Sequence, residues 1–147
     1  MATRIQVAVD CHDSKLMVDF WSTALHYVMP DPPSPFTRWS EYWRSFDLPE
    51  DEIDDHPSMV VDPDGVGPRM FFHEVPEDKV SKNRWHLDLA VSGGRDVPID
   101  VRRERVDAEA DRLVAAGATQ VRVLEAPNHY AIAMLDPEGN EFDLIAG

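Results

Sequence analysis

The sequence contains very little cysteine, since Cys11 is the only one among its 147 residues. A single cysteine excludes an intramolecular disulfide and is typical of a protein from a reducing compartment. The start of the chain also lacks the long apolar run of a secretion signal. We therefore expect a cytoplasmic protein in which Cys11 fills apolar space near the end of the first strand, without a catalytic role.

Positive charge is also scarce. The chain has 14 Lys and Arg residues against 28 Asp and Glu residues, which gives a formal net charge of -14. Such an excess of negative charge repels phosphate backbones and anionic membrane surfaces. Nucleic acids and membranes are therefore excluded as expected partners, and a small molecule is the ligand or substrate that we expect.

Strands and helices are predicted at the same places in both halves of the chain. Residues 5–9 alternate between apolar and polar side chains, which indicates a half-buried strand, and residues 14–25 carry apolar side chains on one helical face. In the second half, residues 85–91 form a predicted strand, and residues 101–116 form a helix that ends at Gly117. In each half, further short strands follow the first strand and its helix.

A turn of one type also recurs in both halves. Residues 62–65 read Asp-Pro-Asp-Gly between two apolar runs, and residues 136–139 read Asp-Pro-Glu-Gly before a last strand. Two more strands are predicted near residues 119–124 and 129–135. Because strand, helix and turn recur in the same order, the chain contains an internal repeat.

The repeat predicts an α+β fold in a single domain, residues 1–147. Two βαβββ modules, about residues 1–80 and 81–147, are expected to form an eight-stranded, incompletely closed, curved mixed sheet. Each module carries its helix on one face of the sheet, which leaves the other face to curve around a ligand.

The strand at residues 83–91, NRWHLDLAV, has one apolar and one polar side. Trp85, Leu87, Leu89 and Val91 alternate with three ionisable residues and are expected to cover the helix. The side chains on the other side of the strand are then expected to point toward the concave face: Arg84, His86 and Asp88.

An insertion at residues 30–56 interrupts the first module. Its prolines exclude a continuous strand, and aromatic residues then recur every three or four positions, which predicts a short helix. The rings are Phe36, Trp39, Tyr42, Trp43 and Phe46. These rings either pack against the apolar core of the first half or close the concave face as the aromatic walls of a pocket. The two interpretations are compatible. With Phe71 and Phe72, the rings favour an aromatic or apolar ligand.

The paired modules, the segment DFWSTALHY, the strand HLDL and the closing DPEGNEFDL resemble the glyoxalase, bleomycin-resistance and extradiol-dioxygenase superfamily, also called vicinal oxygen chelate. The similarity is greatest to the actinobacterial glyoxalase-like domain group. The resemblance implies the fold over nearly the whole chain and a homodimer. It does not imply one reaction, because the fold carries isomerases, epimerases, dioxygenases, thiol transferases and drug-sequestering proteins.

The resemblance also implies a set of metal ligands. The positions that bind a divalent metal in this superfamily fall at Gln6, His86 and Asp143, and the identity of the metal stays open. The fourth position falls at Phe71, which cannot bind a metal, after what looks like a two-residue insertion. His73 takes this place only if the strand slips or bulges.

Two functions remain open at this point. In the first, the protein is a metalloenzyme of the lyase, isomerase or dioxygenase type: His86 binds the metal or acts as a base, and Asp88 orients it or moves a proton, as His73 could. In the second, a metal-free protein sequesters an aromatic compound such as an antibiotic. A metal-free enzyme that uses His86 and Asp88 as an acid–base pair lies between them. The residues expected to line the pocket are Trp39, Trp43, Phe71, His73, Arg84 and Tyr130.

Overall fold

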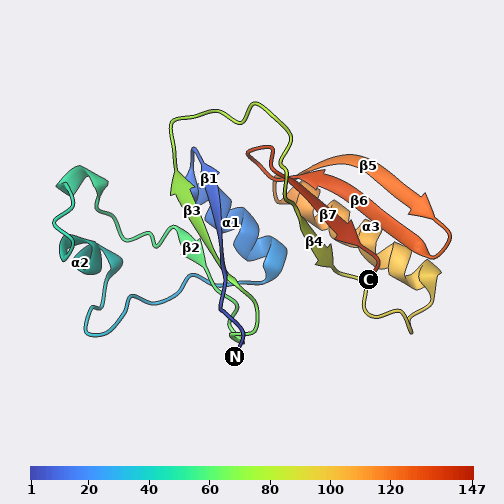
Figure 1. Cartoon of the computed structure of the whole chain (residues 1–147), viewed down its shortest axis with the longest axis horizontal. Helices are drawn as coiled ribbons and strands as arrows, with labels where there is room; N and C mark the ends of the chain where they lie inside the picture. Colours follow the sequence, from blue (N-terminus) through green and yellow to red (C-terminus); the bar gives the residue numbers. More distant parts are fainter. The chain divides into compact units, whose positions relative to one another are not determined.

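The computed structural model describes residues 1–147, and the chain divides into two compact units, Met1–Pro76 and Glu77–Gly147. Each unit contains one sheet with one long helix on a single face (Figure 1). None of the helices combines the length and the apolar composition needed to cross a membrane.

Unit 1 has a three-stranded sheet in the order β1-β3-β2, in which β1 runs parallel to β3, and β2 runs antiparallel to it. An isolated bridge between Val28 and Val61 stands where the module's remaining strand is expected. The elements are β1 (Gln6–Cys11), α1 (Ser14–Leu25), β2 (Met59–Val60) and β3 (Arg69–Glu74). The predicted order of strand, helix and strands is therefore confirmed, with one strand reduced to a bridge.

Alternation along the strands explains how α1 covers this sheet. Met70 and Phe72 of β3 are buried, and the residues between and beyond them are more exposed. Apolar side chains of α1 pack on the same face, and Phe20 and Trp21 contribute the largest of them. Asp13 caps the helix by accepting a hydrogen bond from the backbone N–H of Leu16 at 2.9 Å.

The predicted aromatic helix in the insertion is present as α2 (Trp39–Arg44), followed by the 3₁₀ turn η1 (Glu50–Glu52). Its rings pack mainly on one another, and Trp39 and Trp43 stack with centroids 5.1 Å apart. The indole N–H of Trp39 donates to the carbonyl of Pro30 at 2.9 Å. The backbone N–H of Ser40 donates to Asp55 at 3.0 Å, which fixes the end of the insertion to the start of α2.

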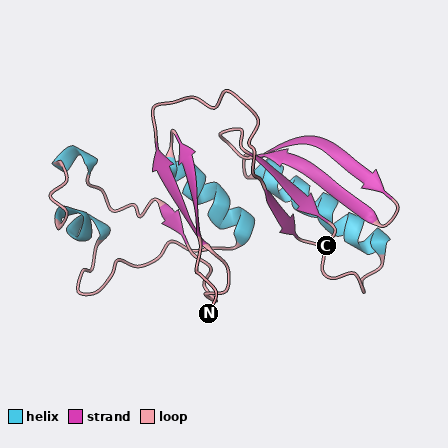
Figure 2. Cartoon of the chain, viewed as in Figure 1, coloured by secondary structure: helices cyan, strands magenta, loops and turns pink.

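Unit 2 is a complete βαβββ module with the sheet order β4-β7-β6-β5. The strands β4 and β7 are parallel, and the other pairs are antiparallel. Figure 2 shows the helix α3 along one face of this sheet. The elements are β4 (Leu87–Ala90), α3 (Ile99–Ala115), β5 (Thr119–Ala126), β6 (His129–Leu135) and β7 (Glu141–Ile145). The α+β class is thus confirmed, with seven strands in two sheets and one bridge.

The core of unit 2 lies between α3 and the sheet. Its fully buried side chains are Val106 and Leu113 of α3, Ile132 and Met134 of β6, and Phe142 and Leu144 of β7. The prediction that Trp85 covers the helix is wrong, because its side chain is 91% exposed. The ladder with β7 begins only at Leu87, so Trp85 precedes the strand and the alternation does not extend to it.

The two repeated turns are stabilised by the same kind of hydrogen bond, in which the first Asp side chain accepts from the backbone. Asp62 accepts backbone hydrogen bonds from Asp64, Val66 and Gly67 at 2.7–3.0 Å. Asp136 accepts them from Glu138 and Asn140 at 2.9–3.0 Å. A short acceptor side chain that bonds the following N–H groups is the reason Asp begins such turns.

Candidate functional site

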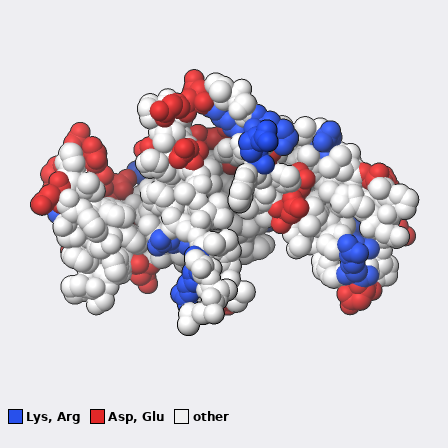
Figure 3. All heavy atoms as spheres, in the orientation of Figure 1, with Lys and Arg blue, Asp and Glu red and all other residues white.

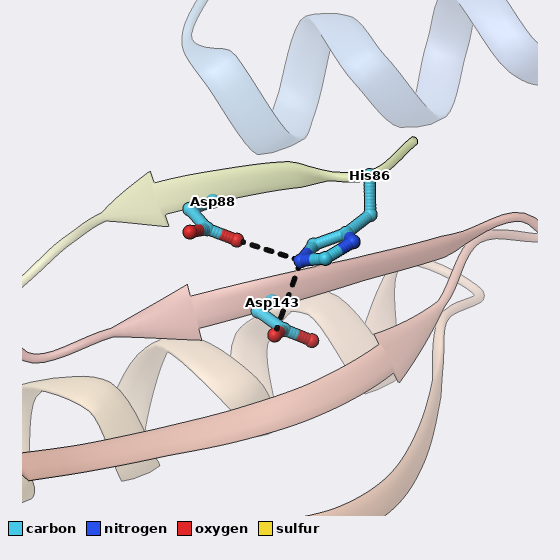
Figure 4. A group of neighbouring side chains, drawn as sticks. All are labelled: His86, Asp88 and Asp143. Carbon is cyan, nitrogen blue, oxygen red and sulfur yellow. Dashed lines mark ion pairs between the residues drawn. The ribbon is translucent and has the colours of Figure 1, made fainter. Parts of the chain in front are cut away.

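Two carboxylates of unit 2 face each other across neighbouring parallel strands. The pairing of β4 with β7 places Asp88 directly opposite Asp143, so both side chains lie on the sheet face opposite α3. We call this face the open face of unit 2. His86 stands two residues before Asp88, and its ring points toward both carboxylates (Figure 4).

The three side chains come together in one cluster. The Nε2 atom of His86 lies 3.3 Å from Asp88 Oδ1 and 3.7 Å from Asp143 Oδ2. One ligand atom of each residue lies within 4.8 Å of those of the other two. The Asp143 side chain is 23% exposed, whereas those of His86 and Asp88 are 41% and 52% exposed.

This donor set fits a divalent metal ion. One imidazole nitrogen and two carboxylate oxygens suit Mn²⁺, Fe²⁺, Zn²⁺ or Ni²⁺. Ligand atoms around an octahedral ion with bonds of about 2.1 Å lie about 3 Å apart. The distances from His86 Nε2 to the two carboxylate oxygens are somewhat larger, and small rotations of these side chains would shorten them to that value. The cluster can therefore bind a cation and polarise oxygen atoms of a substrate.

The corresponding face of unit 1 carries different side chains. Gln6 Oε1 accepts a hydrogen bond of 2.5 Å from Arg69 Nε. The next pair of opposed residues is Ala8 and Phe71. Beyond it, His73 Nδ1 lies 3.4 Å from Asp10 Oδ1.

The register of unit 1 decides which residue corresponds to Asp143. The pairing of β1 with β3 is continuous from Gln6 to Cys11, without the slip or bulge that His73 would need. When Gln6 is aligned with His86, the two first-strand positions that the resemblance implies, the parallel strand pairs make Ala8 and Phe71 correspond to Asp88 and Asp143. Phe71, and not His73, therefore corresponds to Asp143.

The remaining residues expected in the pocket are spread over several elements. Trp39 and Trp43 lie in α2, where Trp39 is buried. Arg84 is exposed and, with Ser81, Lys82 and Asn83, lines a hollow of about 600 Å³. This hollow does not include the side chains of the cluster.

Tyr130 faces α3 instead of the open face. Its hydroxyl donates to Asp107 Oδ1 of α3 at 2.6 Å, and Arg103 of the same helix lies over its ring at 5.6 Å from the centroid. The hydrogen bond to Asp107, together with burial, raises the pKa of Tyr130 to about 12. Tyr130 thus lies on the opposite side of the sheet from Asp143.

Two residues near the cluster are absent from the sequence-based site. Glu141 of β7 accepts the backbone N–H of Asn83 at 2.9 Å and lies 3.3 Å from Lys79 Nζ, which anchors the segment before β4. The sequence could have indicated Glu141, because a residue two positions before Asp143 in the same strand lies on the same face of the sheet. Arg122 of β5 reaches the open face through an irregularity of the strand, which alternation alone does not reveal.

Comparison with solved structures finds the same fold in proteins of low sequence identity. A hypothetical protein from Staphylococcus aureus, SA1046, is 14% identical with a TM-score of 0.60 over 100% of this chain and 99% of that one. A glyoxalase/bleomycin resistance protein/dioxygenase family enzyme from Burkholderia phytofirmans is 17% identical with a TM-score of 0.60 over 95% and 94%. The fosfomycin resistance protein FosX from Listeria monocytogenes, solved as a point mutant with Mn(II) and 1S,2S-dihydroxypropylphosphonic acid, is 12% identical with a TM-score of 0.61 over 100% and 92%. No curated protein sequence matches the chain.

The model of the glyoxalase-like domain family matches residues 6–145. Together with the shared fold, this match defines a protein of the glyoxalase, bleomycin-resistance and dioxygenase superfamily, the vicinal oxygen chelate class. Within this class, the chain belongs to the glyoxalase-like domain family.

Proposed function

We propose that this protein is an enzyme that uses a divalent metal ion to act on a small oxygenated molecule at the open face of unit 2. The observation that supports the proposal is the convergence of His86, Asp88 and Asp143, with one ligand atom of each within 4.8 Å of the others. A bound ion would polarise vicinal oxygen atoms of the substrate and stabilise enolate-like charge. Binding of Mn(II) by the structural neighbour FosX supports a metal of this kind.

The geometry suggests a role for each member of the cluster. A residue that only orients a metal-bound histidine contacts the ring nitrogen that does not bind the metal. Asp88 and Asp143 both approach Nε2 of His86. We therefore assign His86 and Asp143 as ligands and Asp88 as a third ligand or as the base that takes a proton from the substrate, since its side chain is the most exposed.

The decisive experiment is the metal content of protein purified without chelator or immobilised metal. We expect about one divalent ion per chain in the wild type and its loss in His86→Ala. The matched control is His73→Ala, which removes the other His–Asp pair, at 3.4 Å on unit 1, where no third carboxylate is grouped with it. This control should retain the metal.

Two results would contradict the proposal. One is wild-type protein that carries no metal and gains no thermal stability from added Mn²⁺, Ni²⁺, Zn²⁺ or Fe²⁺. The other is equal metal loss in His86→Ala and His73→Ala, which would place binding outside the cluster.

A second function is favoured by the aromatic residues of unit 1. Phe71 stands at the position that corresponds to Asp143, and Trp39 and Trp43 stack in α2. A metal-free protein that sequesters an aromatic ligand would use such rings. Quenching of tryptophan fluorescence by aromatic compounds in the presence of a chelator, lost in Trp43→Leu, would support this alternative.

A further inference from the structure

The strand β5 contains an irregularity beside the candidate site. Thr119 pairs with Leu135 and Gln120 with Met134, but the next pair joins Arg122 to Ala133. Val121 is thus an extra residue without a partner in the ladder. Such a bulge changes the direction of the side chains that follow it.

The bulge moves Arg122 to the open face. Side chains alternate along a strand, so in a regular ladder, with Val121 paired to Ala133, Arg122 would share the face of Gln120, which pairs with the buried Met134. With the bulge, Arg122 lies on the same face as its partner Ala133, and Ala133 pairs with Asp143. Glu125, three residues after Arg122, should by alternation lie on the other face, and it contacts Arg103 of α3 at 2.7 Å. This contact supports the placement of Arg122 on the open face.

Arg122 stands in one row with the carboxylates of the cluster. The row crosses four strands and consists of Asp88, Asp143, Ala133 and Arg122. Since neighbouring strands lie about 4.8 Å apart, the Cα atoms of Asp143 and Arg122 are separated by roughly 10 Å. Ala133 between them is small and leaves room above the sheet.

The next row on the open face is apolar. It consists of Ala90, Ile145, Ala131 and Leu124, in the same strand order. Ala131 is buried, but Ala90, Ile145 and Leu124 are at least partly exposed and give a ligand between Asp143 and Arg122 an apolar surface beside it, which suits a ring or a short carbon chain.

Arg122 is exposed and makes no hydrogen bond or ion pair within the chain. Other arginines of the same unit are paired: Arg103 with Glu125, and Arg112 with Glu109. On the face shown in Figure 3, Asp and Glu side chains are scattered over both units, and Lys and Arg form a few isolated groups. With a net charge of -14, the chain repels anions, so an anionic ligand needs a local cation.

We infer that the ligand of this site carries an anionic group, a carboxylate or a phosphonate, that pairs with Arg122 while its oxygen-bearing end lies at His86, Asp88 and Asp143. The inference rests on the proposed function for the position of that oxygen-bearing end. A guanidinium matches such anions because its planar fork can donate two parallel hydrogen bonds. Arg122 thereby selects the class of substrate without taking part in the chemistry.

The test uses two probes of nearly the same shape, one anionic and one neutral. Both 3,4-dihydroxybenzoate and 3,4-dihydroxybenzamide have vicinal oxygens at one end of a ring, but only the benzoate is anionic at the other. Their affinities are measured by calorimetry with Mn²⁺ present for wild type, Arg122→Gln and His86→Ala. The control variant is Arg95→Gln, which removes the same charge from another exposed arginine that has no ion pair in the chain.

We expect the wild type and Arg95→Gln to bind the benzoate at least about tenfold more tightly than the benzamide, and Arg122→Gln to lose this preference with its benzamide affinity unchanged. Equal binding of the two probes by the wild type, binding of neither, or a preference that survives in Arg122→Gln would overturn the inference. A preference that depends on Arg122 but is unchanged in His86→Ala would support the anion site and contradict the proposed metal function.

Discussion

Phe71 of β3 and Asp143 of β7 occupy the same position in their two modules. Phe71 pairs with Ala8 of the parallel strand β1, and Asp143 pairs with Asp88 of the parallel strand β4. The shared topology therefore carries an apolar pair in one module and a pair of carboxylates in the other. This difference is the reason that the group of side chains that could hold a metal ion is found on the second module.

Substitutions at these two positions should differ in their effect on metal binding. Asp143→Asn removes one negative ligand and is expected to weaken Mn²⁺ binding at least about tenfold. Phe71→Leu removes a ring that donates nothing and should leave the Mn²⁺ affinity unchanged. Titration of both variants with Mn²⁺, followed by electron paramagnetic resonance of the free ion, measures the two affinities. A large loss in Phe71→Leu would show that the metal is bound elsewhere.

Tyr130 is expected to contribute stability that disappears at alkaline pH. Its pKa is raised to about 12 by the hydrogen bond to Asp107 and by burial, so the native state favours the neutral phenol. Because the ordinary pKa is about 10, this contribution is fully present below pH 10 and is lost as the pH rises through about 12. Tyr130→Phe should lower the free energy of unfolding by about 1–2 kcal/mol at neutral pH and flatten its decline above pH 10.

The measurement is denaturant unfolding at a series of pH values, together with the absorbance of ionised tyrosine at 295 nm. Tyr42→Phe is the control, because the hydroxyl of Tyr42 makes no hydrogen bond within the chain. If Tyr130→Phe and the wild type lose stability in parallel above pH 10, the contact with Asp107 is not responsible.

Arg102 is expected to fix the end of the sheet to α3. This buried side chain, 6% exposed, donates to the carbonyls of Val97, Ala146 and Gly147 at 2.9–3.1 Å. Arg102→Met keeps much of the packing but leaves these carbonyls without their donor, which should cost about 2–4 kcal/mol. Urea unfolding measures the loss. Arg95→Met, at an exposed position, should change stability little, and an equal effect of both variants would contradict the role of Arg102.

Asp62 is expected to contribute to acid sensitivity. Backbone hydrogen bonds, that of Gly67 first, lower the pKa of its carboxyl group below the usual value. The contribution is therefore complete above about pH 4 and is lost as the pH falls through the lowered pKa. Melting temperatures measured between pH 6 and pH 2 should fall less steeply for Asp62→Asn than for the wild type. Asp64→Asn, whose side chain accepts no hydrogen bond within the chain, should follow the wild type.

The modules were predictable from sequence because their signals are local. The alternation around Val7 and Val9 and the paired turns at Asp62 and Asp136 each depend on neighbours within a few residues. The expectation that His86 and Asp88 lie on the same side comes from the same alternation, although β4 begins only at Leu87. The mistaken placement of Trp85 shows the limit, because alternation holds only where a partner strand continues the ladder.

By itself, the sequence determined the class of fold and the types of residue available to the site. The tertiary structure decided which of them meet. Asp143 lies opposite Asp88 only because β4 pairs with β7, and Arg122 reaches the same face only because one extra residue interrupts β5. Strand pairing and bulges depend on contacts between segments distant along the chain, so no local pattern reveals them.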